Sequence, residues 1–355
     1  MTIPVHVSRE NSPAEQGLAL GATWRPSIER AYQSYVELFA AHGVGQSQIR
    51  EWGSRALAET RAWAPGLAEE IEGVAAGAGL EPWQLGVLNG RTEILAAAAA
   101  TGEGECSTSV VLEGVPRTVQ TWDWHDTLRH VMLLRAIEVR PGFGVCTFTE
   151  FGIVGKIGVN SEGLGVHFNV LRHGSDHADI GVPVHVVARR ILDESSTVEE
   201  AVRLARSARL SASSVLTVVT RDEVRGLELS PAGVAELAGD VLLHTNHFLD
   251  DALARGERTV PSESTTVERL AALGTRVAAL RSADRDVRAA ALQGHREGGV
   301  PLCAHADLSL PPHTRWESLA TLSIDVTECR LDVHEGGPCK VTPTTWQSLS
   351  AKEIA

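Results

Sequence analysis

A single cysteine at a change of sequence texture is the first candidate for chemistry. Cys106 ends the small, acidic stretch TGEGEC (101–106) and opens a β-rich run in which Ser107, Thr108 and Ser109 follow. A thiol at a loop-to-strand junction is a candidate nucleophile, and neighbouring hydroxyls can donate to a developing oxyanion. The same residues also fit a buried thiol that packs as a small hydrophobe, followed by ordinary strand formers. The local pattern leaves both interpretations open.

Two further polar residues stand beside apolar runs. Asp123 lies between two tryptophans in WDWHD (122–126), and Asn246 lies in TNHF (245–248) after a run of strand formers. Asparagine is poor in strands, so we expect Asn246 to make a specific hydrogen bond, whether structural or catalytic. The alternative for Asp123 is a turn aspartate beside a core tryptophan pair. Both residues are candidates whose role depends on the tertiary fold.

Metal chemistry has weaker support. The segment HGSDH (173–177) gathers His173, Asp176 and His177, which are metal-ligand types, but a glycine-bearing exposed loop is the favoured interpretation and no metal site is predicted. The five cysteines show no CxxC pair, which argues against a disulfide framework or a structural zinc site. No GxSxG, Walker or Rossmann pattern occurs in a strand–turn–helix context. Besides Cys106, we expect the cysteines to pack as ordinary buried thiols: Cys146, Cys303, Cys329 and Cys339.

Helical and strand-like periods alternate along the chain. Apolar residues recur at helical spacing over 13–105, over 183–208, where Thr197 and Glu200 form a capping-box pattern, and over 262–294. Between these regions lie short β-rich runs separated by turns: 107–112, 117–124, 131–139, 145–150, 153–159, 164–170, 213–220, 224–229, 241–245, 318–325 and 330–333. This order predicts one mixed α+β domain spanning all 355 residues, with antiparallel strands packed against helices and a loose C-terminal tail.

The charge balance and the N-terminus narrow the class of protein. A formal net charge of -13 argues against nucleic acid as a partner, because phosphate binding needs a basic surface, and equally against an anionic membrane surface. The N-terminal segment has neither the basic nor the apolar region of a signal peptide, and no apolar run is long enough to span a bilayer. A cytoplasmic enzyme is therefore expected.

Several motifs, in order, resemble the acyl-CoA:6-aminopenicillanic acid acyltransferase family, also called the C45 peptidase family. The glycine-rich segment 152–171 and the ordered set RTE, CST, WDW and NHF make the resemblance specific. The motifs run over nearly the whole chain: PAEQGLALG (13–21), EEIEGVAAGAG (69–79), LNGRTEI (88–94), ECSTS (105–109), VQTWDW (119–124), GIVGKIGVNSEGLGVHFNVL (152–171), GLELSP (226–231), HTNHF (244–248) and GGPC (336–339). The resemblance implies a four-layer αββα fold of the N-terminal-nucleophile hydrolase superfamily.

The resemblance also implies that the chain breaks its own Glu105–Cys106 bond. This autocleavage would give an α chain, 1–105, and a β chain, 106–355, which together form an α/β heterodimer; the oligomeric state beyond that is open. The Cys106 sulfur would attack the Glu105 carbonyl, and water would hydrolyse the resulting thioester. The freed α-amine, with a reference pKa of about 7.7 to 8.0, would then serve as the base for its own thiol.

Individual roles follow from the same resemblance. Cys106 corresponds to the nucleophile, Asp123 to the site aspartate near the cysteine amine, and Asn246 to the oxyanion-hole asparagine. Ser213 in SASS lies where the family has a site serine, and Arg315 corresponds to a site arginine.

Three positions depart from the family's pattern. Glu105 stands where the penicillin enzyme has glycine, Thr121 replaces an asparagine before the WD pair, and Ala304 follows Cys303 where arginine is common. The first departure bears on the efficiency of self-cleavage, and the others bear on the acyl or amine pocket.

The implied activity is hydrolysis or transfer of the acyl group of a small amide or thioester through an acyl-Cys106 intermediate. The substrate partner would be a small amide, amine or acyl thioester. No cofactor is implied, although acyl-CoA is a candidate co-substrate. The alternative is an inactive, unprocessed family member that acts as a small-molecule binding protein, because a fold does not fix a function.

Overall fold

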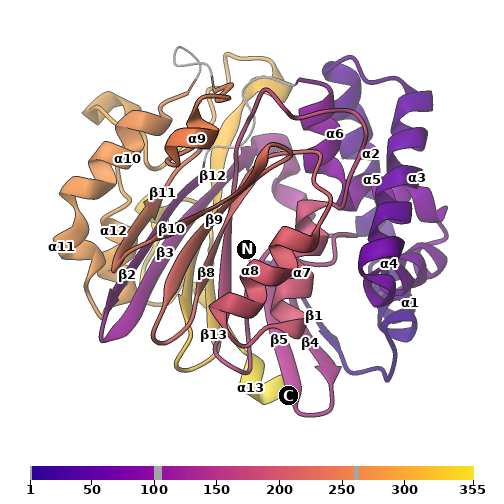
Figure 1. Ribbon diagram of the computed structural model, residues 1–355, viewed down its shortest axis with the longest axis horizontal. Coiled ribbons are helices and arrows are strands. Elements are labelled where there is room, and N and C mark those ends of the chain that lie inside the picture. The colour runs from indigo at the N-terminus through magenta and orange to yellow at the C-terminus, as the bar shows by residue number, and fades with distance from the viewer. Residues whose placement is uncertain (1, 100–105, 260–263) are drawn as a thin grey trace.

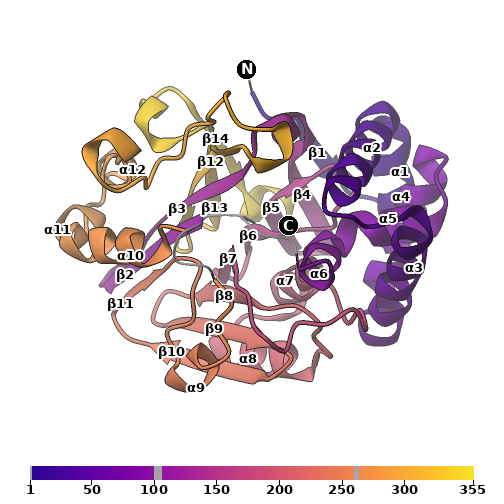
Figure 2. The same ribbon diagram turned by 90° about the horizontal axis from the view of Figure 1, so that it is seen from above.

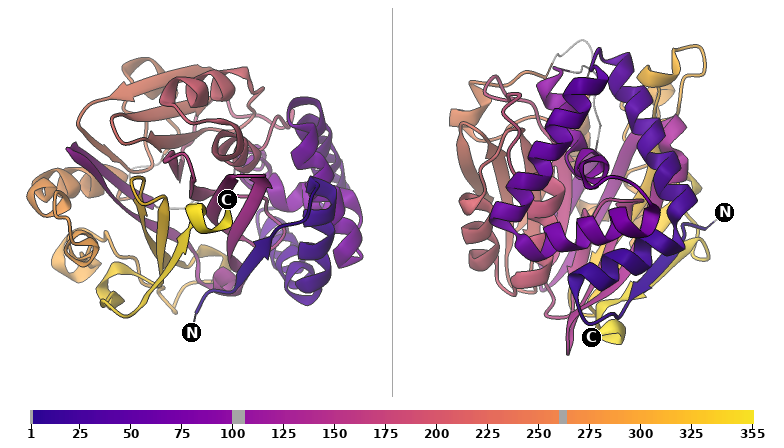
Figure 3. Two further views of the ribbon diagram at one scale, coloured as in Figure 1. Left: turned by 90° about the horizontal axis from the view of Figure 1, so that it is seen from below. Right: turned by 90° about the vertical axis from the view of Figure 1, so that its right-hand side faces the viewer.

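The first part of the molecule is a block of helices that lies beside the sheets (Figure 1 and Figure 3). The structure is a computed structural model that describes residues 2–99, 106–259 and 264–355. The helices of the block are α1 (Pro13–Thr23), α2 (Arg25–Ala41), α3 (Gln46–Trp63), α4 (Pro65–Ala78), α5 (Pro82–Asn89) and α6 (Arg91–Ala97). The helical prediction is thus confirmed as far as α6, whereas 100–105 lie outside the described residues. None of the helices described is long and apolar enough to cross a membrane.

The helices of this block begin and pack as their sequences dictate. Pro13, Pro65 and Pro82 each stand in the first helical turn, where a missing N–H leaves no hydrogen bond unmade. Helix α1 lies directly on α4 because glycines line the contact. A Cβ atom at Gly17 would lie 2.1 Å from the main-chain oxygen of Glu70. Only glycine therefore allows this approach.

The strands form two sheets. The eight-stranded sheet has the order β1-β4-β5-β6-β7-β8-β9-β10. Its strands are β1 (Val5–Ser8), β4 (Met132–Arg140), β5 (Phe143–Glu150), β6 (Ile157–Asn160), β7 (Gly165–Val170), β8 (Ser214–Val219), β9 (Val224–Ser230) and β10 (Gly233–Ala238). The six-stranded sheet has the order β11-β2-β3-β12-β13-β14. Its strands are β2 (Cys106–Glu113), β3 (Val115–His125), β11 (Val241–His244), β12 (Trp316–Asp325), β13 (Arg330–Glu335) and β14 (Trp346–Ser350).

The sheets stack face to face, with β2 against β7 and β13 against β5 and β6. Helices α7 and α8 contact the outer face of the eight-stranded sheet, and α10, α11 and α12 contact the outer face of the six-stranded sheet (Figure 2). The helices after α6 are α7 (Val184–Glu194), α8 (Val198–Ser207), α9 (Asp251–Ala254), α10 (Thr266–Thr275), α11 (Val277–Leu280), α12 (Arg285–Ala290) and α13 (Ala351–Ile354). The predicted α+β class and four-layer αββα arrangement are therefore confirmed. The capping box of Thr197 and Glu200 at the start of α8 is also present.

The C-terminal tail is ordered, so the prediction of a loose tail was wrong. Strand β14 pairs antiparallel with β13, and α13 packs against β5, where a Cβ atom at Gly144 would lie 2.2 Å from the Ala351 oxygen. The strand was missed because it is a short edge strand with no alternating buried face, and such a segment lacks the period of a half-buried strand.

Buried polar contacts hold the helical block on the sheets. The Glu70 carboxylate in α4 lies 2.5 Å from the Arg135 guanidinium in β4 and 3.2 Å from that of Arg189 in α7. Glu93 in α6 accepts a hydrogen bond of 2.8 Å from the Val184 nitrogen at the start of α7. The block is therefore fixed to the sheets by contacts that do not depend on the segment 100–105.

Candidate active site

Strand register brings the three principal candidates together. Cys106 is the first residue of β2, which lies between β3 and β11. In the β2–β3 ladder Cys106 faces Trp122, so the next residue, Asp123, lies just beyond the end of β2. Asn246 lies two residues past the end of β11 on the other side. The start of β2 is thus flanked by the aspartate and the asparagine.

The main chain of Cys106 is held on both sides by side chains. Its nitrogen donates to Asn246 Oδ1 at 2.8 Å. Its carbonyl oxygen accepts from Asn169 Nδ2 at 3.1 Å and from Arg269 Nη1 at 2.8 Å. The side chain itself is 2% exposed. The nucleophile candidate is therefore fixed in position and shielded from solvent.

Arg269 in α10 fixes the orientation of the Asn246 amide. Arg269 Nη2 donates to Asn246 Oδ1 at 2.9 Å. Because a guanidinium only donates, the atom that faces it and the Cys106 nitrogen must be the amide oxygen. The amide nitrogen of Asn246 donates to the Val170 carbonyl at 3.0 Å. Asn246 thus accepts a hydrogen bond from the nitrogen of the candidate nucleophile, and its oxyanion-hole role stays a prediction.

Asp123 is buried beside the thiol. Its main-chain N–H lies near the Cys106 sulfur and acts to lower the pKa of the thiol. Its carboxylate accepts a hydrogen bond of 2.6 Å from Ser318 Oγ, and Ser318 is its register partner in β12. The aspartate is therefore held by β12 and lies close enough to the thiol to affect the thiol's charge.

Burial dominates the acidity of the thiol. It raises the pKa of Cys106 to about 12, and the Asp123 carboxylate acts in the same direction. The cations of Arg269 and Lys156 oppose this rise without overcoming it. The thiol is therefore protonated near neutral pH, and attack by its sulfur needs a base within the site.

A buried charged network lies behind the thiol. Glu150 at the end of β5 forms ion pairs with Lys156 and with Arg91 in α6, the latter at 2.8 Å. Burial raises the pKa of Glu150, but the charges of Arg91 and Lys156 outweigh it and hold the pKa at about 2. Burial lowers the pKa of Lys156 to about 7 against the opposing charge of Glu150. Lys156 Nζ lies 4.0 Å from the ring centroid of Trp122, the strand partner of Cys106.

This network predicts a large loss of stability on substitution of Glu150. Glu150→Gln removes the anion that faces the buried Arg91 cation and lowers the pKa of Lys156 further, so we expect the free energy of unfolding to fall by about 3–5 kcal/mol, measured by urea denaturation at pH 7. The folded-state pKa of Glu150 lies below its ordinary value of 4.5. The stabilisation that the Glu150 carboxylate contributes is therefore present above about pH 4.5 and is lost as the pH falls towards 2. The free energy of unfolding of the variant should lack this pH dependence.

The exposed Glu162 provides the control, since Glu162→Gln should change the free energy of unfolding by less than about 0.5 kcal/mol. A loss below about 1 kcal/mol for Glu150→Gln would contradict the assignment of a net stabilising charge to this carboxylate.

Two of the site residues predicted from the sequence form their hydrogen bonds and ion pairs with residues other than Cys106. Ser213, just before β8, donates to Asp176 Oδ1 at 2.6 Å. Arg315, just before β12, donates to the Leu310 carbonyl at 2.7 Å and lies 3.8 Å from the Asp126 carboxylate. The arginine that reaches the Cys106 main chain is Arg269.

The contacts of Asp176 also explain the HGSDH segment. One carboxylate oxygen accepts from Ser213, and the other accepts from the His173 nitrogen at 2.9 Å. These bonds within and next to the segment agree with the loop interpretation of the sequence.

Three residues around Cys106 were missed as site residues in the sequence. Lys156 and Asn169 both occur inside apolar strand-like runs, in GIVGKIGV and VHFNVL. A charged or amide side chain in such a run is a signal for a buried polar contact. Arg269 lies within the predicted helical block, where an arginine is ordinary, so its sequence carries no comparable signal.

The αββα layers, with a thiol at the start of an inner strand, define the fold of an N-terminal-nucleophile hydrolase. A model of the family described as acyl-coenzyme A:6-aminopenicillanic acid acyl-transferase matches residues 113–301, more than half of the chain. The chain is 30% identical over 260 residues to the 40 kDa form of acyl-coenzyme A:6-aminopenicillanic-acid-acyltransferase from Emericella nidulans, covering 69% of this chain and 70% of that one. The chain therefore belongs to this family of acyl-transferring enzymes.

Solved structures resemble the chain more distantly. Penicillin V acylase from Agrobacterium tumefaciens has 16% identity and a TM-score of 0.40, covering 68% of this chain and 85% of that one. An N-acylethanolamine-hydrolyzing acid amidase orthologue from Caenorhabditis elegans has 12% identity and a TM-score of 0.44, covering 62% of this chain and 93% of that one.

Proposed function

We propose that this chain is an autoproteolytic cysteine enzyme that hydrolyses or transfers the acyl group of a small amide or thioester. The observation that carries the proposal is the set of contacts around Cys106. Asn246 accepts from its nitrogen, Arg269 and Asn169 bind its carbonyl, and Asp123 lies beside its sulfur. A residue whose nitrogen must become a free amine, yet stay in place, needs such contacts on its main chain.

The first reaction would be cleavage of the Glu105–Cys106 bond. The sulfur bonds to the Glu105 carbonyl carbon, the carbon–nitrogen bond breaks, and the nitrogen gains a proton, so that a thioester and an α-amine form. Water then adds to the thioester and releases the Glu105 carboxylate and the thiol. Glu105 lies outside the described residues, so this step rests on family membership and on the geometry of Cys106.

Turnover would repeat this chemistry on an external substrate. The α-amine takes the thiol proton, and the sulfur attacks the acyl carbon of the amide or thioester. The leaving amine or thiol departs with a proton, and an acyl-Cys106 intermediate remains. Water or an amine then accepts the acyl group, which gives a hydrolase or a transferase respectively. Acyl-CoA is a candidate acyl donor because the family's description names it.

Denaturing mass spectrometry of the purified protein tests the cleavage. We expect two chains that meet between Glu105 and Cys106, and we expect them to co-migrate on native size exclusion because ion pairs such as Glu70–Arg135 join the helical block to the sheets. The processed enzyme should then be assayed with acyl-amines and acyl-CoA thioesters, with and without added amines. Product formation that requires an added amine would identify a transferase.

A second function is favoured by features of Cys106 and of the residue before it. The thiol is buried and its pKa is raised to about 12, and Glu105 stands where the penicillin enzyme has glycine. These features fit an inactive, unprocessed protein that binds a small molecule. An intact chain, together with no labelling of Cys106 by iodoacetamide, would overturn the enzymatic proposal in favour of this one.

A further inference from the structure

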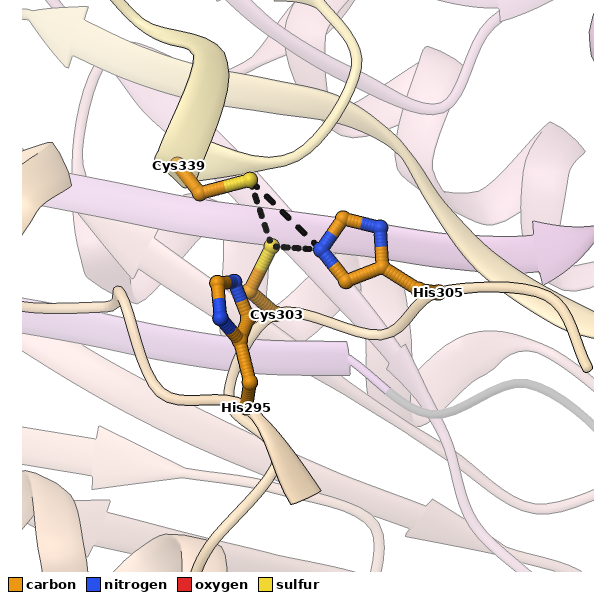
Figure 4. Close-up of side chains that lie close together, drawn as sticks. All are labelled: His295, Cys303, His305 and Cys339. Atoms are coloured by element: carbon orange, nitrogen blue, oxygen red, sulfur yellow. Dashed lines mark hydrogen bonds between the residues drawn. The ribbon is translucent and has the colours of Figure 1, made fainter. Parts of the chain in front are cut away.

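Four potential metal ligands meet on the outer side of the six-stranded sheet. The cysteine–histidine cluster consists of His295, Cys303, His305 and Cys339, whose ligand atoms all lie within 4.8 Å of one another (Figure 4). Three of them come from the connection between α12 and β12, and Cys339 comes from the short 3-10 helix η4 (Pro338–Lys340) after β13. No other cluster of this kind occurs in the part of the chain that the structure describes.

The distances among three of the four ligand atoms fit a single tetrahedral ion. The two sulfurs, of Cys303 and Cys339, lie 3.6 Å apart, and His305 Nε2 lies 3.6 Å from the first and 3.5 Å from the second. A zinc ion with Zn–S of about 2.3 Å and Zn–N of about 2.05 Å would separate two sulfurs by about 3.8 Å and a sulfur from a nitrogen by about 3.6 Å. A disulfide would need a sulfur–sulfur distance of about 2.05 Å.

The fourth ligand, His295, lies farther out, with its ligand atom up to 4.8 Å from the others, so a rotation of this exposed side chain would complete the set. The imidazole of His295 meets that of His305 edge to face, with ring centroids 4.8 Å apart, and lies next to the Cys303 sulfur in Figure 4. Two thiolates and two neutral imidazoles would neutralise a divalent cation.

The segments that carry the ligands are joined by hydrogen bonds that need no metal. The Cys303 nitrogen donates to the Gly294 carbonyl at 2.9 Å, which fixes the residue next to His295. Gln293 Nε2 donates to the Pro338 carbonyl at 3.1 Å, which joins this loop to the residue before Cys339. These bonds lie beside each ligand pair, so the cluster is preorganised for an ion.

Gly337 shows how closely the chain approaches the buried sulfur. A Cβ atom at this position would lie 2.6 Å from the Cys303 sulfur. A side chain at this position would displace either the Cys303 thiol or the segment that carries Cys339. The closeness of the two ligand-bearing segments therefore explains the second glycine of the GGPC motif, Gly337.

We propose that the cysteine–histidine cluster binds one zinc ion as a structural site. Tetrahedral sulfur and nitrogen ligands select zinc among the common divalent ions. Four protein ligands leave no open position for water or substrate, which is the property of structural zinc and excludes a Lewis-acid role. The ion would add bonds between the connection before β12 and the turn after β13, which the hydrogen bond from Gln293 to Pro338 already holds together.

Hydrogen bonds connect the cysteine–histidine cluster to Asp123, the residue beside the candidate nucleophile. Ala304, between two ligands of the cluster, exchanges hydrogen bonds with Ser318 in β12: the Ser318 nitrogen donates to the Ala304 carbonyl at 3.0 Å, and the Ala304 nitrogen donates to Ser318 Oγ at 2.9 Å. Ser318 Oγ in turn donates to Asp123. Zinc would therefore fix the loop that positions Ser318 against the aspartate beside Cys106.

Metal analysis of the full chain, purified without a histidine tag and with a wash in a weak chelator, tests the proposal. We expect about one zinc per chain by plasma mass spectrometry, and a thiolate-to-metal charge-transfer band after Co²⁺ replaces the zinc. Cys303→Ser and His305→Gln should each lower zinc content to less than about one tenth of the wild-type value when equilibrated against the same chelator.

Two matched variants control for the substitutions themselves. Cys329→Ser removes a buried thiol in the turn between β12 and β13, and His313→Gln removes an exposed imidazole near β12; both should keep about one zinc. His305 is exposed, so His305→Gln should retain the wild-type circular dichroism even if Cys303→Ser does not fold. Metal-free wild-type protein, or a Cys303–Cys339 disulfide found by alkylation without reductant, would overturn the proposal.

Discussion

Replacement of Cys106 by alanine is expected to abolish both self-cleavage and turnover. The proposed mechanism uses its sulfur to attack Glu105 and then the substrate, and it uses its nitrogen as the base. Without the sulfur no acyl-enzyme can form, so activity should fall by at least about 10³-fold. Denaturing mass spectrometry should show one chain of 355 residues, and an assay on the best acyl donor should show no product above background.

The buried thiol of Cys329, outside the site, gives the matched control. Cys329→Ala should be cleaved and active at close to the wild-type level. Cys106→Ser separates the two reactions further, because a hydroxyl keeps the position of the nucleophile but attacks more slowly. A Cys106→Ala protein that still splits at residue 105, or still turns over substrate, would show that another nucleophile is used.

The sequence could propose candidate residues but could not give the contacts between them. Cys106, Asp123 and Asn246 were each distinguished by type and motif, and the structure brings them to one end of the six-stranded sheet. That meeting depends on β11 pairing with β2 although a long stretch of chain separates them. Pairing between distant strands is fixed by the tertiary fold, so a single sequence can propose the residues but cannot place them together.

The residues that sequence reasoning missed share one property: their role depends on which face of an element meets which neighbour. Arg269 is one arginine in a helical region, and only the docking of α10 on β2 directs it to Cys106. Cys303 and Cys339 are 36 positions apart and have no CxxC spacing. The expectation that these two pack as ordinary thiols rested on that spacing, whereas their closeness is created by the pairing of β12 with β13.

Substitution of Asp123 by asparagine should move two properties of Cys106 in opposite directions. The Asp123 carboxylate contributes to the raised pKa of the thiol, so its removal should lower that pKa and speed alkylation of Cys106 by iodoacetamide at pH 8 to 9 (about two- to tenfold). In the proposed turnover, however, the α-amine becomes a cation when it takes the thiol proton. The carboxylate stabilises that cation, and so its loss should lower kcat/KM by about 10²-fold.

This opposition distinguishes a role in proton transfer from a merely structural one. If Asp123 only maintained the fold, unfolding would expose the buried thiol and would also speed alkylation. The opposition is therefore read only from variant protein that keeps the wild-type circular dichroism and free energy of unfolding. Asp325→Asn, at the far end of β12, should change neither property. Ser318→Ala removes the hydroxyl that donates to Asp123 and should give a smaller loss of turnover with a retained carboxylate charge. Unchanged turnover in Asp123→Asn would mean that another group stabilises the ammonium. We would then assign that stabilisation to Asn246, whose side-chain oxygen accepts a hydrogen bond from the Cys106 nitrogen.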